Sequence, residues 1–92
     1  MDEIRDREMT SAHADINFSA LLMDLVRPIV DTPDEVMVME EESEDGLLLT
    51  LKVAEADVGM IIGKHGKIAR AIRTVIKAAA RISDKKVTVE IK

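Results

Sequence analysis

The stretch GMIIGKHGKIARAIR, from Gly59 to Arg73, sets two glycines around Lys64 and His65 and then continues into a basic segment with an apolar stripe. Beyond Gly66 the apolar residues recur with the spacing of one helical face, which predicts a helix that begins just after this glycine. A tight Gly-x-x-Gly connection in front of a helix N-terminus brings main-chain N–H groups close to a bound anion. The stretch therefore predicts a helix, a short loop and a second helix that together form a phosphate site.

We expect both Gly63 and Gly66 to adopt positive φ and to let a phosphodiester approach the main chain. Lys64 and Lys67 add positive charge, and Lys64 and His65 are expected to be exposed at the tip of the loop. For His65 a second interpretation stays open, in which the side chain is only a spacer that faces solvent.

Three isoleucines flank the glycines: Ile61, Ile62 and Ile68. They are candidates for the floor of a narrow apolar groove against which unpaired bases lie. Each of them also fits the core of the domain, and the sequence alone leaves both interpretations open.

A helical wheel of the segment after Gly66 separates an apolar side, which includes Val75 and is expected in the core, from a basic side. On the basic side Arg70 and Arg73 lie nearer the loop and are the better candidates for contacts with a polyanion. Lys77 and Arg81 are expected mainly to solvate the exposed face.

Charge is segregated along the chain, whose 92 residues carry a net charge of −5. Residues 1–62 contain 16 acidic and 4 basic side chains, whereas residues 63–92 contain 9 basic and 2 acidic ones. This asymmetry favours a local polyanion site beside an acidic remainder, although solvated helix faces produce the same pattern. Phe18 is the sole aromatic residue, so binding by base stacking on rings is disfavoured.

The elements around this stretch follow from periodicity and turn residues. We predict a flexible acidic tail over residues 1–16 and a single domain over residues 17–92, with elements in the order α-β-β-α-α-β. A right-handed crossover makes the last strand parallel to its neighbour, which gives a three-stranded mixed sheet with helices on one face and an α+β fold class. The predicted elements are a helix from Phe18 to about Val30 that Pro28 loosens, strands Val36–Glu41 and Leu47–Val53, a helix Val58–Ile62 capped by Asp57, the helix after Gly66 and a strand over residues 85–92.

The sequence VGMIIGKHGKIARAIR in this α-β-β-α-α-β order resembles the signature of the KH domain of type II, the prokaryotic version. The resemblance covers roughly residues 18–92 and extends to the small stand-alone bacterial KH proteins. It implies single-stranded RNA held in a groove of about four nucleotides, with the loop on the RNA backbone. Residue by residue, it carries the loop over to Gly63, Lys64, His65 and Gly66. It also carries over Ile62 and Ile68 as the apolar flanks of the loop. To this RNA-binding set we add Lys67, Arg70 and Arg73.

The resemblance further implies a cytoplasmic bacterial protein that acts in post-transcriptional regulation, as an RNA chaperone-like protein. It also implies a homodimer, or a heterodimer with a larger KH-containing protein of the Jag family. A protein-interaction module with little RNA affinity of its own is the alternative.

Other classes of function fit the sequence poorly. Three residues separate Gly59 from Gly63, where a P-loop has four between its glycines, and Lys64 is followed by His65 instead of Ser or Thr. The two histidines, His13 and His65, have no companion ligand cluster, and the chain has no cysteine. We therefore expect no enzyme, no cofactor and no metal. A membrane-surface role for the amphipathic segment 67–82 is disfavoured because the core needs its apolar face.

Overall fold

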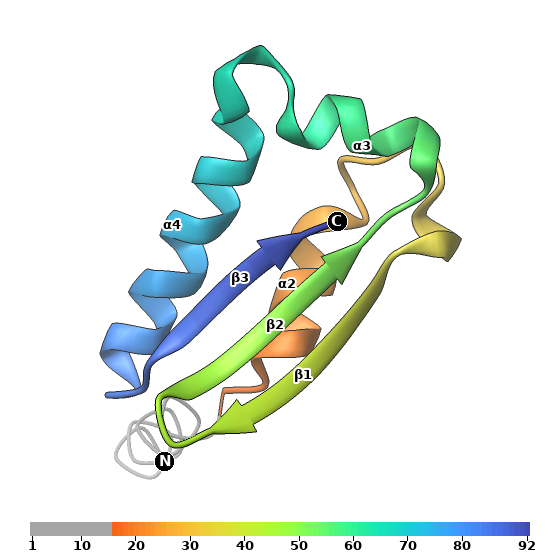
Figure 1. Ribbon diagram of the computed structural model, residues 1–92. Helices are drawn as coiled ribbons and strands as arrows, with labels where there is room; N and C mark the ends of the chain where they lie inside the picture. The colour runs from red at the N-terminus through yellow and green to blue at the C-terminus, as the bar shows by residue number, and fades with distance from the viewer. Residues whose placement is uncertain (1–15) are drawn as a thin grey trace, which may run out of the picture.

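The computed structural model describes residues 16–92, so the predicted tail lies outside the described residues except for Ile16. The order α-β-β-α-α-β is confirmed, with two single turns of 3-10 helix inserted (Figure 1). The elements are α2 (Phe18–Val26), η1 (Pro33–Glu35), β1 (Met37–Ser43), β2 (Gly46–Lys52), α3 (Glu55–Ile62), η2 (Lys64–Gly66), α4 (Lys67–Ile82) and β3 (Val87–Ile91).

The three strands form one mixed sheet in the order β1-β2-β3. The first two strands pair antiparallel around a hairpin whose last paired residues are Ser43 and Gly46. β3 returns parallel to β2, in a register that places Val87 opposite Leu47. The predicted mixed topology is confirmed, and it leaves β1 and β3 as the two edge strands.

Helices cover one face of the sheet, as predicted: α2 lies behind the hairpin and α4 runs alongside β3 (Figure 1). Alternate residues of the strands face these helices, and Leu49 and Leu51 of β2 are fully buried there. The opposite face is open, with 56% of Met37 and 51% of Met39 exposed. No helix within residues 16–92 is long and apolar enough to cross a bilayer.

The first helix begins as predicted and ends earlier. The Asn17 side chain accepts a hydrogen bond from the Ala20 N–H at 3.1 Å, which caps the helix N-terminus. The predicted end near Val30 is wrong, because α2 stops at Val26. Pro28 has no N–H to continue the helical ladder, and the next donor, the Ile29 N–H, bonds the Val26 carbonyl in a tighter turn.

The predicted capping role of Asp57 is also wrong. Helix α3 begins two residues before Asp57, with Ala54 at its N-cap position and no side-chain cap. The Asp57 side chain is buried, and its two carboxylate oxygens accept from the Asp31 and Thr32 N–H groups at 3.2 and 3.1 Å. Asp57 therefore fastens the loop after α2 to the start of α3.

Candidate nucleic-acid interface

The loop between α3 and α4 contains three consecutive residues in the left-handed region. Lys64, His65 and Gly66 have φ values of 51°, 63° and 68°. Only the last of them is a glycine, and a side chain at such a φ costs roughly 1–2 kcal/mol. The side chains of Lys64 and His65 are exposed at the tip of the loop, as predicted. Strain of this kind persists where the surrounding structure enforces it, and it concentrates at functional sites.

Gly63 differs from the prediction, because its φ is −76°. Its backbone is extended, so the residue is not required there by positive φ. The requirement is close contact: a Cβ at this position would collide with the carbonyl oxygen of Gly59. The Gly63 N–H bonds that same carbonyl at 2.8 Å, which closes α3 and lets the chain turn sharply outward.

The N-terminus of α4 is open to an anion. Gly66 occupies the N-cap position without a side-chain hydrogen bond, and the first turn contains no acidic residue. The first N–H groups of a helix have no intrahelical acceptor, and the positive end of the helix dipole lies with them. Lys67 is exposed on this turn and adds a full positive charge.

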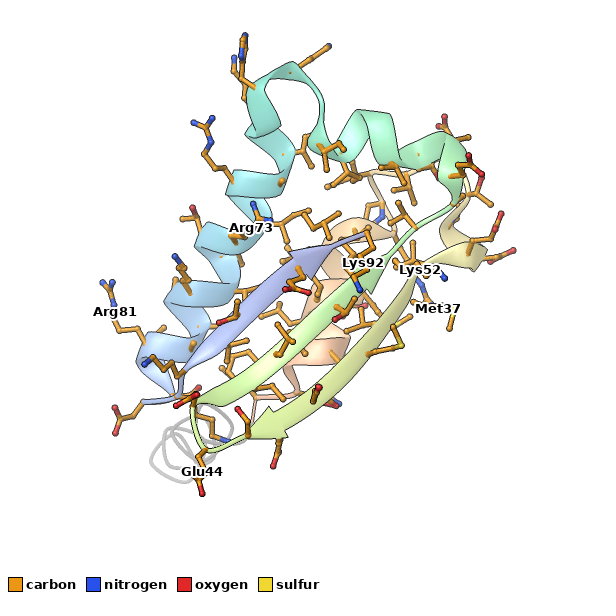
Figure 2. The ribbon with its side chains drawn as sticks, in the orientation of Figure 1. Met37, Glu44, Lys52, Arg73, Arg81 and Lys92 are labelled. Carbon is orange, nitrogen blue, oxygen red and sulfur yellow. The ribbon has the colours of Figure 1, made fainter. Side chains whose placement is uncertain are left out.

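The two predicted arginines act at different places. Arg70 donates from Nη2 to the His65 carbonyl oxygen at 2.5 Å, so it lies against the loop. Arg73 turns instead toward the sheet, where its Nε donates to the Val89 carbonyl oxygen of β3 at 3.3 Å (Figure 2). Arg81, in the last turn of α4, points away from the fold.

The flanking isoleucines separate into core and surface. Ile61 is fully buried, so the interpretation of this residue as a groove floor is wrong. Ile62 is 52% exposed beside the loop, and Ile68 is partly buried against the core. The expectation that Val75 belongs to the core is wrong too, because its side chain is 42% exposed.

The cations of α4 lack neutralising partners in the part of the chain that the structure describes. Within residues 16–92 none of them lies in an ion pair, although the chain as a whole is acidic. All five are exposed: Lys67, Arg70, Arg73, Lys77 and Arg81. An exposed helix face with this charge attracts a polyanion such as a nucleic-acid backbone.

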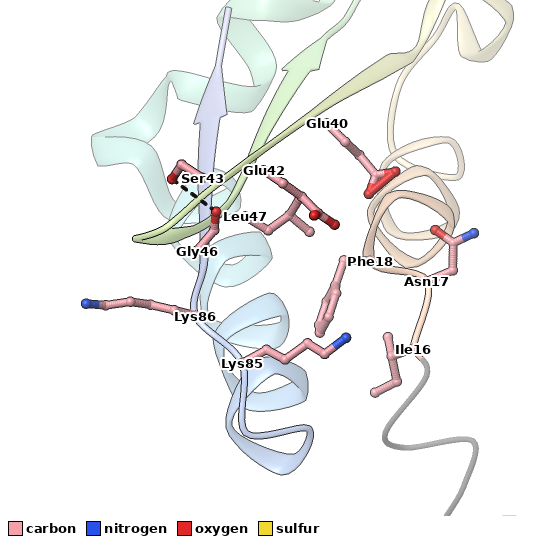
Figure 3. Close-up of a pocket in the computed structure, with 10 residues that line it drawn as sticks. All are labelled: Ile16, Asn17, Phe18, Glu40, Glu42, Ser43, Gly46, Leu47, Lys85 and Lys86. Atoms are coloured by element: carbon pink, nitrogen blue, oxygen red, sulfur yellow. Dashed lines mark hydrogen bonds between the residues drawn. The ribbon is translucent and has the colours of Figure 1, made fainter.

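A cavity of about 440 Å³ lies elsewhere, at the end of the hairpin (Figure 3). Phe18 and Leu47 line it together with Glu40 and Glu42 of β1, and Lys85 enters from the turn before β3. Two carboxylates facing this space disfavour a phosphate backbone. The loop surface, with exposed cations beside an open helix N-terminus, is the better site for one.

Sequence reasoning missed that Arg73 lies against the edge strand β3. A smaller cavity of about 180 Å³ lies between α4 and this edge strand, lined by Arg73, Ile76, Lys77, Val87, Thr88 and Val89. A basic residue seven positions after Gly66 was the available signal. Its side chain is long enough to reach either the loop or the sheet, so the sequence did not distinguish the two.

A helix, a Gly-x-x-Gly loop and a second helix between two parallel strands, preceded by a helix and a strand, define a KH domain of type II. The KhpA/KhpB KH domain family matches residues 19–91, and the chain belongs to this family.

Curated relatives agree with this assignment. The chain is 55% identical over 71 residues to "RNA-binding protein KhpA" of Clostridium acetobutylicum. The aligned segment covers 77% of this chain and 95% of the relative. It is 43% identical over 77 residues to the Bacillus subtilis protein of the same name, covering 84% and 95%. The Listeria monocytogenes protein of that name is 42% identical over 71 residues, covering 77% and 93%. No solved structure matches the chain.

Proposed function

We propose that this protein binds single-stranded RNA, with the phosphate backbone held at the loop from Gly63 to Gly66 and the N-terminus of α4. The observation that carries the proposal is the exposed left-handed turn at Lys64 and His65, which directly precedes an uncapped helix N-terminus. The relatives named RNA-binding protein KhpA support the same class of ligand.

The geometry favours contacts with the backbone over contacts with particular bases. An open helix N-terminus and exposed lysines recognise phosphate, which every nucleotide carries. The affinity should therefore depend strongly on salt and weakly on sequence at this part of the site. No Phe, Tyr or Trp ring is available for base stacking near the loop, since the sole residue of these types, Phe18, lies buried in α2.

Fluorescence anisotropy with labelled single-stranded RNA tests the proposal. The variant Lys64→Asp, His65→Asp reverses the charge of the loop, and aspartate tolerates the left-handed backbone better than most residues. Its matched control is Lys85→Asp, Ala20→Asp, which makes the same formal charge change at exposed positions of the opposite end. We expect the loop variant to lose binding and the control to retain most of it, with circular dichroism verifying both folds. An equal loss of RNA affinity in the two variants would mean that the loop is not part of the RNA-binding site.

A regulatory role in the cytoplasm, of the RNA chaperone kind, is part of the same proposal. A non-catalytic protein that holds short unpaired segments of RNA delays their pairing or exposes them to a partner. An RNA-annealing assay with complementary strands measures this effect directly, and the loop variant is its control.

A second candidate function is pairing with another KH domain, either a second copy or a Jag-family protein. It is favoured by an apolar groove of about 160 Å³ between α2 and α4, lined by Leu25, Ile29, Ile68, Ala71, Ile72 and Val75. Exposed side chains such as Ile82, 63% accessible, extend the apolar surface of α4. Apolar surface of this kind in a small domain is typical of an interaction site.

Sedimentation equilibrium of the native chain distinguishes self-association from a monomer. Val75→Asp places a charge in the groove, whereas Thr74→Asp adds the same charge at the neighbouring exposed position. A dimer that only the Val75 variant dissociates would place the interface at the groove, and a native monomer at micromolar concentration would exclude tight self-association.

A further inference from the structure

The helix-covered face of the sheet is left unfilled at its hairpin end. In β1, Glu40 and Glu42 pair with Leu49 and Leu47 of β2. Residues directly opposite each other on neighbouring strands share a face, and Leu49 is fully buried, so both glutamates lie on the core side of β1. The cavity of about 440 Å³ lies over them, and its volume is in the range of sites that hold a small ligand, about 300–1,000 Å³.

This cavity has an acidic side and a basic side. In Figure 3 the carboxylates of Glu40 and Glu42 lie on the β1 side of the Phe18 ring, and the ammonium group of Lys85 lies on its other side. Within residues 16–92 none of these three charges lies in an ion pair. Leu47 adds apolar surface to that of the ring. A fitting occupant therefore carries basic groups toward β1 and acidic groups toward the turn before β3.

The chain itself leads into the cavity. Ile16, the first residue that the structure describes, lines it together with Asn17 and Phe18, so the preceding residues 1–15 are tethered at its edge. A short tether gives an effective concentration of about millimolar, at which weak contacts suffice for docking. The eight residues between Arg7 and Ile16 span up to roughly 27 Å, which is enough for the chain to turn back over the cavity.

The sequence of this tethered segment has the complementary pattern of charge. Residues 4–8 read IRDRE, in which Arg5 and Arg7 alternate with Asp6 and Glu8. In an extended segment alternate side chains project to the same side, about 7 Å apart, which is also the spacing of the two core-facing glutamates of β1. One side of such a segment is basic and the other acidic. Arginine is the cation whose planar group matches a carboxylate best.

We propose that residues 4–9 dock across this cavity as an extended strap, with Arg5 and Arg7 on the carboxylates of Glu40 and Glu42. The acidic residues that alternate with the arginines then face the basic side of the cavity. The occupant is the protein's own segment because its tether and its charge pattern both match the site.

The docked strap has two consequences for the domain. Its apolar end residues, Ile4 and Met9, supply surface that covers Phe18 at the unfilled end of the core. It also holds the acidic residues of the segment at the hairpin end, opposite the loop between α3 and α4 (Figure 1). The RNA-binding face is thereby kept clear of an internal competitor.

Paramagnetic relaxation enhancement in the full chain tests the strap. The sequence contains no cysteine, so Glu3→Cys provides a single site for a nitroxide label beside the proposed strap. We expect the label to broaden the amide signals of Glu42 and Leu47 and to leave those of residues 63–67 sharp. Circular dichroism verifies the fold of each labelled chain.

Charge reversal identifies the contacts. Arg5→Glu, Arg7→Glu should abolish most of the broadening, because four carboxylates would then meet at the cavity. The matched control Arg27→Glu, Lys52→Glu makes the same formal charge change at exposed positions that do not line the cavity, and it should retain the broadening.

A charge swap then tests whether the two pairs touch directly. Glu40→Arg, Glu42→Arg alone should also lose the broadening, and its combination with Arg5→Glu, Arg7→Glu should restore it.

Three outcomes would overturn the strap. The first is equal broadening in the native and charge-reversed chains, which a freely moving segment produces. The second is broadening centred on residues 63–67, which would place the acidic segment on the RNA-binding face instead. The third is failure of the charge swap to restore the broadening. No RNA is present in these measurements, so their result and that of the RNA-binding assay are independent.

Discussion

The guanidinium of Arg70 donates to the main-chain carbonyl oxygen of His65, across the loop that precedes its own helix. The contact joins the first turns of α4 to the strained residue at the loop tip. It leaves the His65 side chain free to face solvent, and it places a fixed positive charge beside the helix N-terminus. Arg70 is thus a support for the loop as well as a candidate for phosphate contact.

Arg70→Gln should weaken RNA binding more than Lys77→Gln, which also removes one exposed charge from the same face of α4. A charged hydrogen bond in an exposed position contributes about 1 kcal/mol, and its loss frees the loop to leave the left-handed conformation. Amide hydrogen exchange of residues 63–67 measures this loosening. Lys77→Gln removes a charge from the same face without touching the loop, and it should leave exchange unchanged. Faster exchange in both variants, or in neither, would contradict the supporting role.

The two loop glycines should respond differently to alanine. Gly63→Ala introduces a methyl group against the Gly59 carbonyl, and we expect it to lower the free energy of unfolding by about 2–3 kcal/mol. At Gly66 the added methyl would meet nothing within 4 Å, and Gly66→Ala costs only the left-handed conformation, about 1 kcal/mol. Urea denaturation gives both values. If Gly66→Ala destabilises the domain more than Gly63→Ala does, the expected collision between the new methyl group at position 63 and the Gly59 carbonyl oxygen is relieved by a small shift of the backbone, and the prediction is wrong.

Asp57→Asn should destabilise the domain by about 2 kcal/mol. The carboxylate accepts two main-chain hydrogen bonds inside the fold, and an amide offers one acceptor and sets a donor against the other N–H. Glu55→Gln, two residues earlier and exposed, is the control and should change stability by less than about 0.5 kcal/mol. Thermal unfolding followed by circular dichroism measures both. Equal stability of the two variants would mean that the loop at Asp31 and Thr32 does not depend on Asp57.

RNA affinity should fall with salt in proportion to the phosphates that the site contacts. For a groove of about four nucleotides, three or four phosphate contacts predict a slope of log K against log salt of about −2 to −3. Lys67→Gln removes one contact and should reduce the magnitude of the slope by about 0.7. Anisotropy titrations over a range of chloride concentrations test this. A slope near zero would indicate that affinity does not come from the backbone.

Patterns that repeat along the chain were sufficient to predict the architecture. The alternation around Leu49 and Leu51 and the helical period after Gly66 each follow from burial on one side, and both elements are confirmed. The exposed loop tip at Lys64 and His65 was also predictable, because glycines and charged residues exclude that segment from the core. The assignment of the site residues to RNA remains a prediction.

What sequence reasoning missed depends on contacts between distant segments. Asp57 looks like a helix cap until the loop at Thr32 is brought against it, and Gly63 looks like a positive-φ residue until Gly59 is seen behind it. Similarly, periodicity places Val75 on the apolar side of α4, but too little of the fold lies over that position to cover it. Each case is a pairing in space that no local pattern encodes.

The two edges of the sheet carry opposite electrostatic characters, and this bears on aggregation. β3 is flanked by Arg73, whereas the other edge strand, β1, contains the consecutive exposed residues Glu40, Glu41 and Glu42. An exposed edge is a template for strand addition, and natural sheets block such edges with charge. Joining two copies edge to edge through β1 would bring three glutamates from each into one ladder. The acidic run thereby disfavours pairing of two copies of the domain through their β1 edges.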